Sequence, residues 1–213
     1  MNLIFVGDPM CSWCYGFGKE LSTVLDSDPS LSLQIVVGGL RAGGTEVLDA
    51  AGKQLRLSHW ERVEAASGVT FNRDALMARQ GFVYDTEPIC RAVVTARRLA
   101  PGVRLLDVFR ALQHAFYVEG ADTTEPNSLA RVTAEALTAA GYPTDADVVL
   151  KQFNDNSTIT ETSDDFRKAR NWGINSFPAL LAKLDGRLQV VTPGFRNAAG
   201  IRGAILALRE RVA

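Results

Sequence analysis

The chain has 213 residues, of which 46% are hydrophobic and 22% are charged, and its formal net charge is -1 at pH 7. This length can bury one good core, or one core with an inserted lobe. Lys and Arg are scattered among Asp and Glu, which excludes a basic stripe, so we expect no nucleic-acid partner. No apolar run approaches the roughly 20 residues that cross a bilayer, and no leader-like segment precedes the first strand, so we expect no membrane partner and a cytoplasmic location.

The first 40 residues predict a strand, a helix and a second strand. Residues 3–6 (LIFV) form a short apolar run that the break signal at 7–9 (GDP) ends. Residues 11–25 follow a helical pattern, and residues 31–37 then give a second apolar strand. Two apolar strands joined through a helix favour a βαβ unit with a buried parallel pair.

From residue 45 to residue 142 the pattern changes to helices separated by polar, Pro or Gly breaks. Residues 87–99 and 128–139 are alanine-rich helical stretches that end near Pro101 and Gly141. A third helix has an apolar stripe that predicts a core-facing side, formed by Leu105, Val108, Phe109, Leu112 and Phe116. Together these helices predict a helical lobe inserted between sheet elements.

The sheet signal returns after a helical, charge-rich stretch at residues 160–172. Two short apolar runs, 179–182 and 188–191, flank the pair Asp185-Gly186. Such a pair is typical of a two-residue hairpin, because a type I′ turn needs positive φ at both central positions. A final helix closes the chain, indicated by Ile201, Ala204, Ile205 and Leu208. Without the insert, the order of elements is that of thioredoxin.

Cys11 and Cys14 are the candidate catalytic residues. They flank Ser12 and Trp13 where the first strand gives way to a helix. The first turn of a helix has unpaired backbone N–H groups and the positive end of the helix dipole, which favour a thiolate over a thiol. Cys11 is therefore the predicted nucleophile, at an exposed junction, and Cys14 the thiol that resolves its mixed disulfides. Neither intervening residue offers a cation to the sulfur, so we expect a milder oxidant than a dedicated disulfide donor.

The same cysteine spacing also suits half of a zinc site. A tetrahedral site needs four ligands, and the chain offers only Cys90, His59 and His114 besides the pair, none of them in a second closely spaced pair. We therefore expect no metal. A second alternative is that both cysteines are ordinary small hydrophobic core residues.

Three segments resemble the DsbA-like superfamily, in its FrnE-like group of disulfide isomerase-like proteins. Residues 8–17 (DPMCSWCYGF) resemble the active-site segment of that group. Residues 111–120 (ALQHAFYVEG) with 122–124 (DTT) resemble part of its inserted domain, and residues 172–179 (WGINSFPA) resemble the loop that carries a cis-proline. The resemblance therefore spans essentially the whole chain.

The resemblance implies an α/β thioredoxin fold with a large inserted helical domain. Residues 1–42 and 156–213 would form the thioredoxin-like domain, and 43–155 the insert. Pro178 is expected to be cis, so that the backbone of Phe177 pairs with an extended substrate. Together with Trp13, these two residues are the predicted substrate-binding residues.

Several other side chains have two interpretations. Asp8 could shuttle a proton for Cys14, although a turn or capping role is favoured for Asp before Pro. Cys90 is interpreted as a buried structural thiol and His114 as a packed or hydrogen-bonded side chain. Three aromatic residues next to the cysteines are interpreted as a partly exposed apolar rim that meets substrates, namely Trp13, Tyr15 and Phe17. For Tyr15 and Phe17 the alternative is that they anchor the helix.

The functional prediction is a thiol-disulfide oxidoreductase, similar to protein disulfide isomerases, that acts on protein dithiols or small thiols. No cofactor is expected, and glutathione stays open as a co-substrate. One alternative is a glutathione-dependent enzyme of the 2-hydroxychromene-2-carboxylate isomerase or kappa-class transferase type, whose members use a hydroxyl or lone thiol at the helix start. The presence of both cysteines argues against it. The other alternative is a non-catalytic binding adaptor on the same fold.

Overall fold

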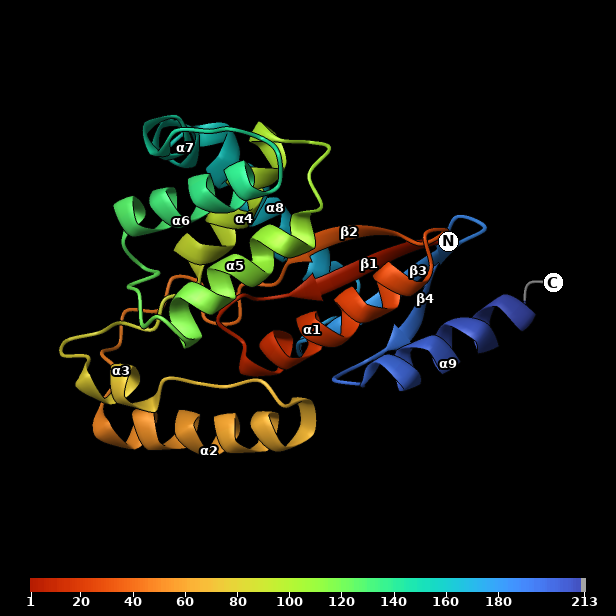
Figure 1. The fold of residues 1–213 in the computed structure, drawn as a ribbon, viewed down its shortest axis with the longest axis horizontal. Coiled ribbons are helices and arrows are strands. Elements are labelled where there is room, and N and C mark those ends of the chain that lie inside the picture. The colour runs from red at the N-terminus through yellow and green to blue at the C-terminus, as the bar shows by residue number, and fades with distance from the viewer. Residues whose placement is uncertain (212–213) are drawn as a thin grey trace.

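A four-stranded sheet with helices on both faces forms the centre of the protein in the computed structural model, which describes residues 1–211 (Figure 1). The chain starts with the expected βαβ unit, continues through a run of helices, and ends with a hairpin and a helix. The elements in chain order are β1 (Asn2–Gly7), α1 (Ser12–Ser27), β2 (Ser32–Val37), α2 (Ala50–Ser67), α3 (Arg73–Ala78), α4 (Glu87–Leu99), α5 (Leu105–Tyr117), α6 (Pro126–Ala139), α7 (Ala146–Phe153), α8 (Asn156–Asn171), β3 (Ala179–Leu184), β4 (Arg187–Thr192) and α9 (Ala198–Glu210).

The strand order in the sheet is β2-β1-β3-β4. β1 pairs in parallel with β2 and antiparallel with β3, and β3 pairs antiparallel with β4. The central strand β1 is buried from Leu3 onward because helices cover both of its faces, and this explains its continuous apolar sequence. The β3–β4 turn has φ of 48° at Asp185 and 76° at Gly186, as the hairpin prediction requires.

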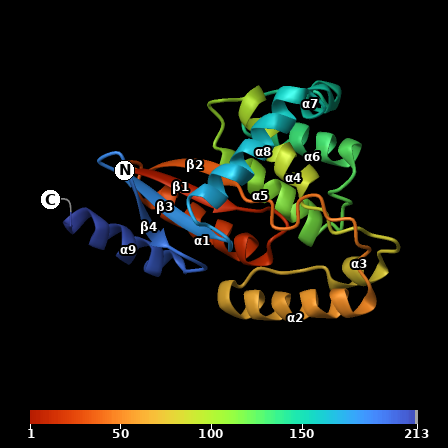
Figure 2. The ribbon, with the colours of Figure 1, turned by 180° about the vertical axis from the view of Figure 1, so that it is seen from behind.

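The helices lie in layers around this sheet. In Figure 1, α1 and α9 lie in front of the sheet, and Figure 2 shows α8 on the opposite face. Helices α4 to α7 pack together beside β2, and α2 with α3 forms a separate arm that contacts α1. The predicted mixed α/β thioredoxin fold with helices inserted between β2 and β3 is confirmed. The division at residues 43 and 155 stays a prediction.

A partly buried ion pair joins the helical region to the sheet. Arg97 on α4 donates to the Asp165 carboxylate at 2.9 Å and to the backbone oxygen of Ile35 at 3.0 Å. Asp165 on α8 also accepts from the backbone N–H of Val37 in β2. The Asp165 carboxylate and the Arg97 guanidinium thus hold α8 and α4 against the end of β2.

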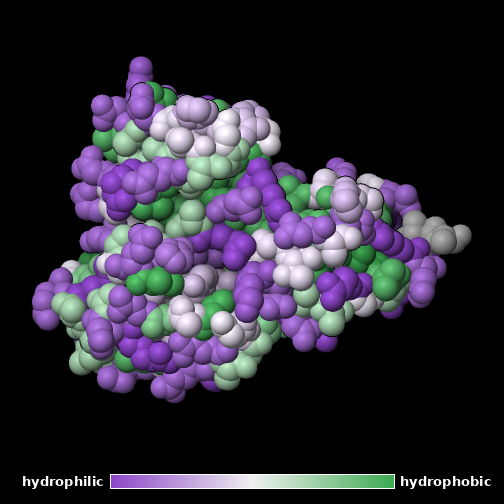
Figure 3. Space-filling model, in the orientation of Figure 1, coloured by the Kyte–Doolittle hydropathy of each residue, from purple (hydrophilic) through white to green (hydrophobic). Residues whose placement is uncertain are grey.

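On the face shown in Figure 3, hydrophilic residues predominate and hydrophobic ones form small scattered groups. None of the helices within residues 1–211 combines the length and apolar character that a membrane span requires.

Candidate active site

Cys11 lies at the start of α1, where it is the N-cap residue. Its backbone is extended (φ -85°, ψ 115°), and its carbonyl accepts from the N–H of Tyr15 at 3.1 Å. The first turn of α1 contains no acidic residue. The free N–H groups and the dipole of the helix therefore act on the Cys11 sulfur without a neighbouring carboxylate in that turn to oppose them.

Asp8 fixes the turn that delivers Cys11 to the helix. Its buried carboxylate accepts from the backbone N–H of Met10 at 2.8 Å and from that of Leu40 at 2.7 Å. Burial raises the pKa of Asp8, although these bonds and one from Thr86 partly oppose the shift. These contacts support the favoured turn role. The proton-shuttle interpretation stays a prediction.

The Cys11 side chain faces the loop that carries Pro178. Its sulfur lies 3.6 Å from the backbone oxygen of Phe177, and the Phe177–Pro178 peptide bond is cis, as the resemblance implies. Cys11 is only 7% exposed, so the expectation of an exposed junction is wrong for its side chain. The reason is that Leu40 and α2 cover the start of α1 and leave a cavity of about 540 Å³ that Cys11 lines.

Cys14 lies one turn further along α1 and is completely buried. Burial raises the pKa of Cys14 well above its ordinary value, and a hydrogen bond with Cys11 and the charge of Cys11 raise it further. Both cysteines are free thiols. The buried Cys14 thiol is therefore held in its protonated form at neutral pH.

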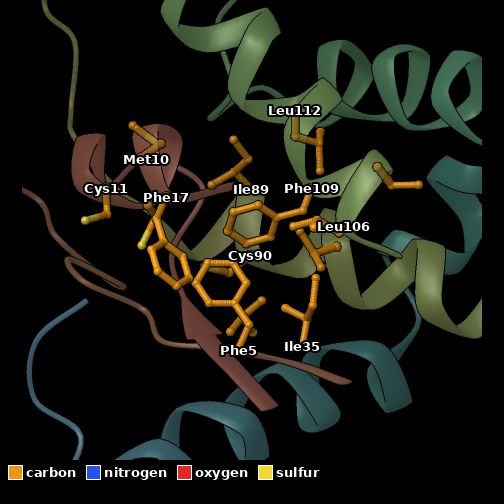
Figure 4. Close-up of a cluster of buried hydrophobic side chains, with 14 of the residues drawn as sticks. Phe5, Met10, Cys11, Phe17, Ile35, Ile89, Cys90, Leu106, Phe109 and Leu112 are labelled. Carbon is orange, nitrogen blue, oxygen red and sulfur yellow. The ribbon is translucent and has the colours of Figure 1, made fainter. Parts of the chain in front are cut away.

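The structure brings two of the three predicted substrate-binding residues to the cavity. Trp13 and Phe177 both line it beside Cys11, whereas Pro178 is buried and does not. The Phe177 ring also packs on Gly38, where a Cβ would lie 2.2 Å from the ring. Figure 4 shows Cys11 at the margin of the core cluster, with its sulfur pointing away from the rings of Phe5 and Phe109.

The rest of the cavity lining includes residues that the sequence did not single out as substrate-binding or catalytic, and of these only His59 was considered, as a metal ligand. Arg56, His59 and Trp60 come from α2, and Arg41 and Tyr84 from loops. The Tyr84 hydroxyl donates to the backbone oxygen of Met10 at 2.6 Å, and the Arg56 guanidinium lies 4.2 Å from the centre of the Tyr84 ring. Burial, with the charges of Arg62 and Arg56, lowers the pKa of His59, so the cations of this lining at neutral pH are Arg41 and Arg56.

The remaining predicted side chains lie away from the cavity. Cys90 is buried with its sulfur 3.6 Å from the Asp8 carboxylate, and His114 is exposed and hydrogen-bonded to Glu119 at 3.1 Å. Within residues 1–211, no group of three or more His, Cys, Asp or Glu side chains is placed to hold a metal ion.

Of the three aromatic residues interpreted as a rim, Trp13 alone lines the cavity, and its contact with substrates stays a prediction. Trp13 lines the cavity and lies 5.4 Å from Phe195, centre to centre. Phe17 is fully buried against Phe5, so the rim interpretation is wrong for it. Tyr15 is partly exposed but stacks on Tyr117, which makes it a helix anchor.

Comparisons with solved structures identify the fold. A "putative protein disulfide isomerase" from Nitrosomonas europaea is 28% identical, covers 100% of this chain and 98% of its own, and has a TM-score of 0.86. The cytosolic disulfide reductase DsbM from Pseudomonas aeruginosa is 24% identical with full coverage of both chains and a TM-score of 0.79. The chain therefore has a DsbA-like fold. A 2-hydroxychromene-2-carboxylate isomerase has the same DsbA-like fold at 12% identity, with 99% and 96% coverage and a TM-score of 0.65.

No protein-family model and no curated protein matches the sequence. The assignment as DsbA-like therefore rests on the fold, and the narrower FrnE-like group stays a prediction. This DsbA-like fold occurs in a disulfide reductase and in an isomerase, so the fold alone does not determine the reaction. The reaction must be inferred from the side chains at the start of α1.

Proposed function

We propose that this DsbA-like protein is a thiol-disulfide oxidoreductase in which Cys11 is the nucleophile and Cys14 the resolving thiol. The observation that carries the proposal is the unequal placement of the two sulfurs. Cys11 lines a cavity at the positive end of a helix, whereas Cys14 is fully buried behind it with a raised pKa. Thiol-disulfide exchange needs one accessible thiolate and a second thiol held in reserve.

The steps follow from this placement. The Cys11 thiolate attacks one sulfur of a substrate disulfide, forms a mixed disulfide, and releases the other substrate sulfur as a thiolate. Loss of the Cys11 charge removes one contribution to the raised pKa of Cys14. Cys14 then gives up its proton and attacks the Cys11 sulfur, releasing the second substrate thiol. The protein dithiol is oxidised by two electrons, and the substrate disulfide is reduced by the same two.

Substrate docking is proposed to use the loop before β3. The backbone of Phe177 already contacts the Cys11 sulfur through its carbonyl oxygen. An extended substrate segment that pairs with this backbone would place its disulfide at Cys11. Protein dithiols and small thiols both suit this arrangement. A cytosolic site of action is part of the proposal, supported by the fold likeness to a protein described as a cytosolic reductase.

Insulin reduction compares the proposed roles directly. We expect the wild-type protein to reduce insulin disulfides in the presence of a reductant and Cys11→Ser to abolish this activity. Cys14→Ser should lose turnover but still form a mixed disulfide. Full activity of Cys11→Ser would refute the proposal.

A glutathione-dependent isomerase or transferase is the second candidate, because a 2-hydroxychromene-2-carboxylate isomerase shares the fold. Activity toward glutathione conjugates that survives Cys14→Ser would favour it. No turnover in either assay would favour a binding adaptor.

A further inference from the structure

The cavity that Cys11 lines adjoins a second one. The second cavity, of about 490 Å³, is lined by residues 43–49 and the start of α2. Both cavities are lined by the same four residues, Arg41, Leu55, Arg56 and Tyr84. The two cavities therefore adjoin at a shared wall that contains both arginines, and together they are called the groove.

Neither arginine has a carboxylate partner within the described part of the chain. The ion pairs of residues 1–211 include neither the Arg41 nor the Arg56 guanidinium. The acidic residues of the groove, Glu46 and Asp49, line the second cavity but not the one that holds Cys11. Asp49 is already engaged, because its carboxylate caps α2 by accepting from the N–H of Gly52 at 2.7 Å.

Arg56 is held in place although it lacks a carboxylate partner. It donates one hydrogen bond, to the backbone oxygen of Gly52 at 3.0 Å, and its guanidinium plane lies over Tyr84. Burial lowers the pKa of Arg56, the charge of the exposed Arg41 lowers it further, and Tyr84 opposes the shift. A guanidinium with free N–H donors at a partly buried site is suited to a planar carboxylate.

We propose that Arg41 and Arg56 form a carboxylate-binding subsite that selects small, peptide-like thiols and disulfides bearing carboxylates, the class to which glutathione belongs. This inference deepens the proposed function and rests on it for the redox step. The carboxylates of the bound molecule contact the two guanidinium groups, and its sulfur faces Cys11. In the reduction of glutathione disulfide, the protein dithiol supplies both electrons, one glutathione leaves as a thiolate on attack by Cys11, and the second leaves on attack by Cys14.

Binding is tested apart from redox chemistry with S-methylglutathione, a thioether that exchanges with no disulfide. We expect calorimetry to detect binding to the wild-type protein and a loss of about 10-fold in affinity for Arg41→Gln and for Arg56→Gln, because a hydrogen bond between charged groups contributes at least that factor. Arg62→Gln is the matched control, since Arg62 is an exposed residue of the same helix that does not line the groove. It should bind within about twofold of wild type.

The rate of disulfide reduction tests the selectivity. In single-turnover stopped-flow fluorescence with the reduced protein, glutathione disulfide should react about 10-fold more slowly with Arg56→Gln, whereas neutral hydroxyethyl disulfide should react within about twofold of wild type. The neutral substrate also reports whether the variant is folded. Equal losses for both substrates, or arginine variants that bind S-methylglutathione as wild type does, overturn the subsite.

The outcomes separate the two proposals. Reduction of hydroxyethyl disulfide with no dependence on the arginines keeps the oxidoreductase and refutes the subsite. Arginine-dependent binding of S-methylglutathione without reduction of any disulfide keeps the subsite and refutes the oxidoreductase. A loss of insulin reduction in the arginine variants, with no binding of S-methylglutathione, refutes the small-thiol proposal in favour of acidic protein substrates.

Discussion

Gly16 on α1 is the residue that lets α2 approach the cysteine-bearing helix. A Cβ at this position would lie 2.7 Å from the Ser67 Oγ and 3.0 Å from a Val63 methyl group, both on α2. Gly203 on α9 is an internal control, because a Cβ there would have nothing within 4 Å. Alanine gains about 1 kcal/mol of helix propensity over glycine at either site. Only Gly16→Ala also adds an overpacking cost of about 1–3 kcal/mol.

We therefore expect Gly203→Ala to raise the free energy of unfolding by about 1 kcal/mol and Gly16→Ala to leave it unchanged or lower it by up to about 2 kcal/mol. Urea denaturation measures the free energy of unfolding of the wild type and both variants. The gain in helix propensity is common to the two variants, so the difference between them reports the overpacking at Gly16. Since α2 carries Arg56 and Trp60 to the cavity, Gly16→Ala should also slow the reaction of Cys11 with glutathione disulfide. Equal stabilisation by the two substitutions would refute the close contact between α1 and α2.

Three further predictions concern the surroundings of the site. Burial raises the pKa of Cys90, whereas the same thiol in the unfolded chain has a pKa near 9.0. Above pH 9.0 the unfolded chain therefore loses the Cys90 proton while the folded protein keeps it. The contribution of the Cys90 thiol to the free energy of unfolding is present below that pH and is lost as pH rises above it. Cys90→Ala should then make the fall in unfolding free energy above pH 9.0 shallower by up to about 1.4 kcal/mol per pH unit in urea titrations, and an unchanged slope contradicts this. Gly38→Ala should displace the Phe177 ring, lower the free energy of unfolding by about 1–3 kcal/mol in thermal unfolding, and change the reactivity of Cys11. Wild-type stability and wild-type Cys11 reactivity in this variant would argue against the packing of Phe177 on Gly38. Arg97→Ala should destabilise the protein by about 3 kcal/mol because it leaves the Asp165 carboxylate buried without its guanidinium, and Asp165→Asn in the same background should recover part of the loss.

Local sequence signals predicted most of the fold. The bounds of α4 agree with its predicted stretch, and the Asp185-Gly186 turn and the parallel β1–β2 pair lie where the pattern placed them. These features depend on residues close together in the chain. Helix α2 was not predicted as a separate element, because its apolar residues are spread around the helix and give no single stripe.

The candidate site was predictable only in part, for the same reason. The cysteines, Trp13 and Phe177 belong to recognisable local segments. The cavity wall does not, because Arg56 and Trp60 reach Cys11 through the packing of α2 on α1. No periodicity in residues 50–67 indicates which of its side chains face the thiols. The burial of Cys11 was missed because it depends on that same long-range packing, and the burial of Phe17 because a helix anchor and a rim residue look alike in sequence.

The unequal roles of the two cysteines are tested most directly by trapping the intermediate. Reduced wild-type protein and Cys14→Ser are each mixed briefly with glutathione disulfide at neutral pH, quenched with acid, and mapped by peptide mass spectrometry. We expect a Cys11–Cys14 disulfide in the wild type and a stable glutathione adduct on Cys11 in Cys14→Ser, with Cys90 unmodified in both. An adduct on Cys90, or a Cys11 that stays unmodified in both proteins, would contradict the account.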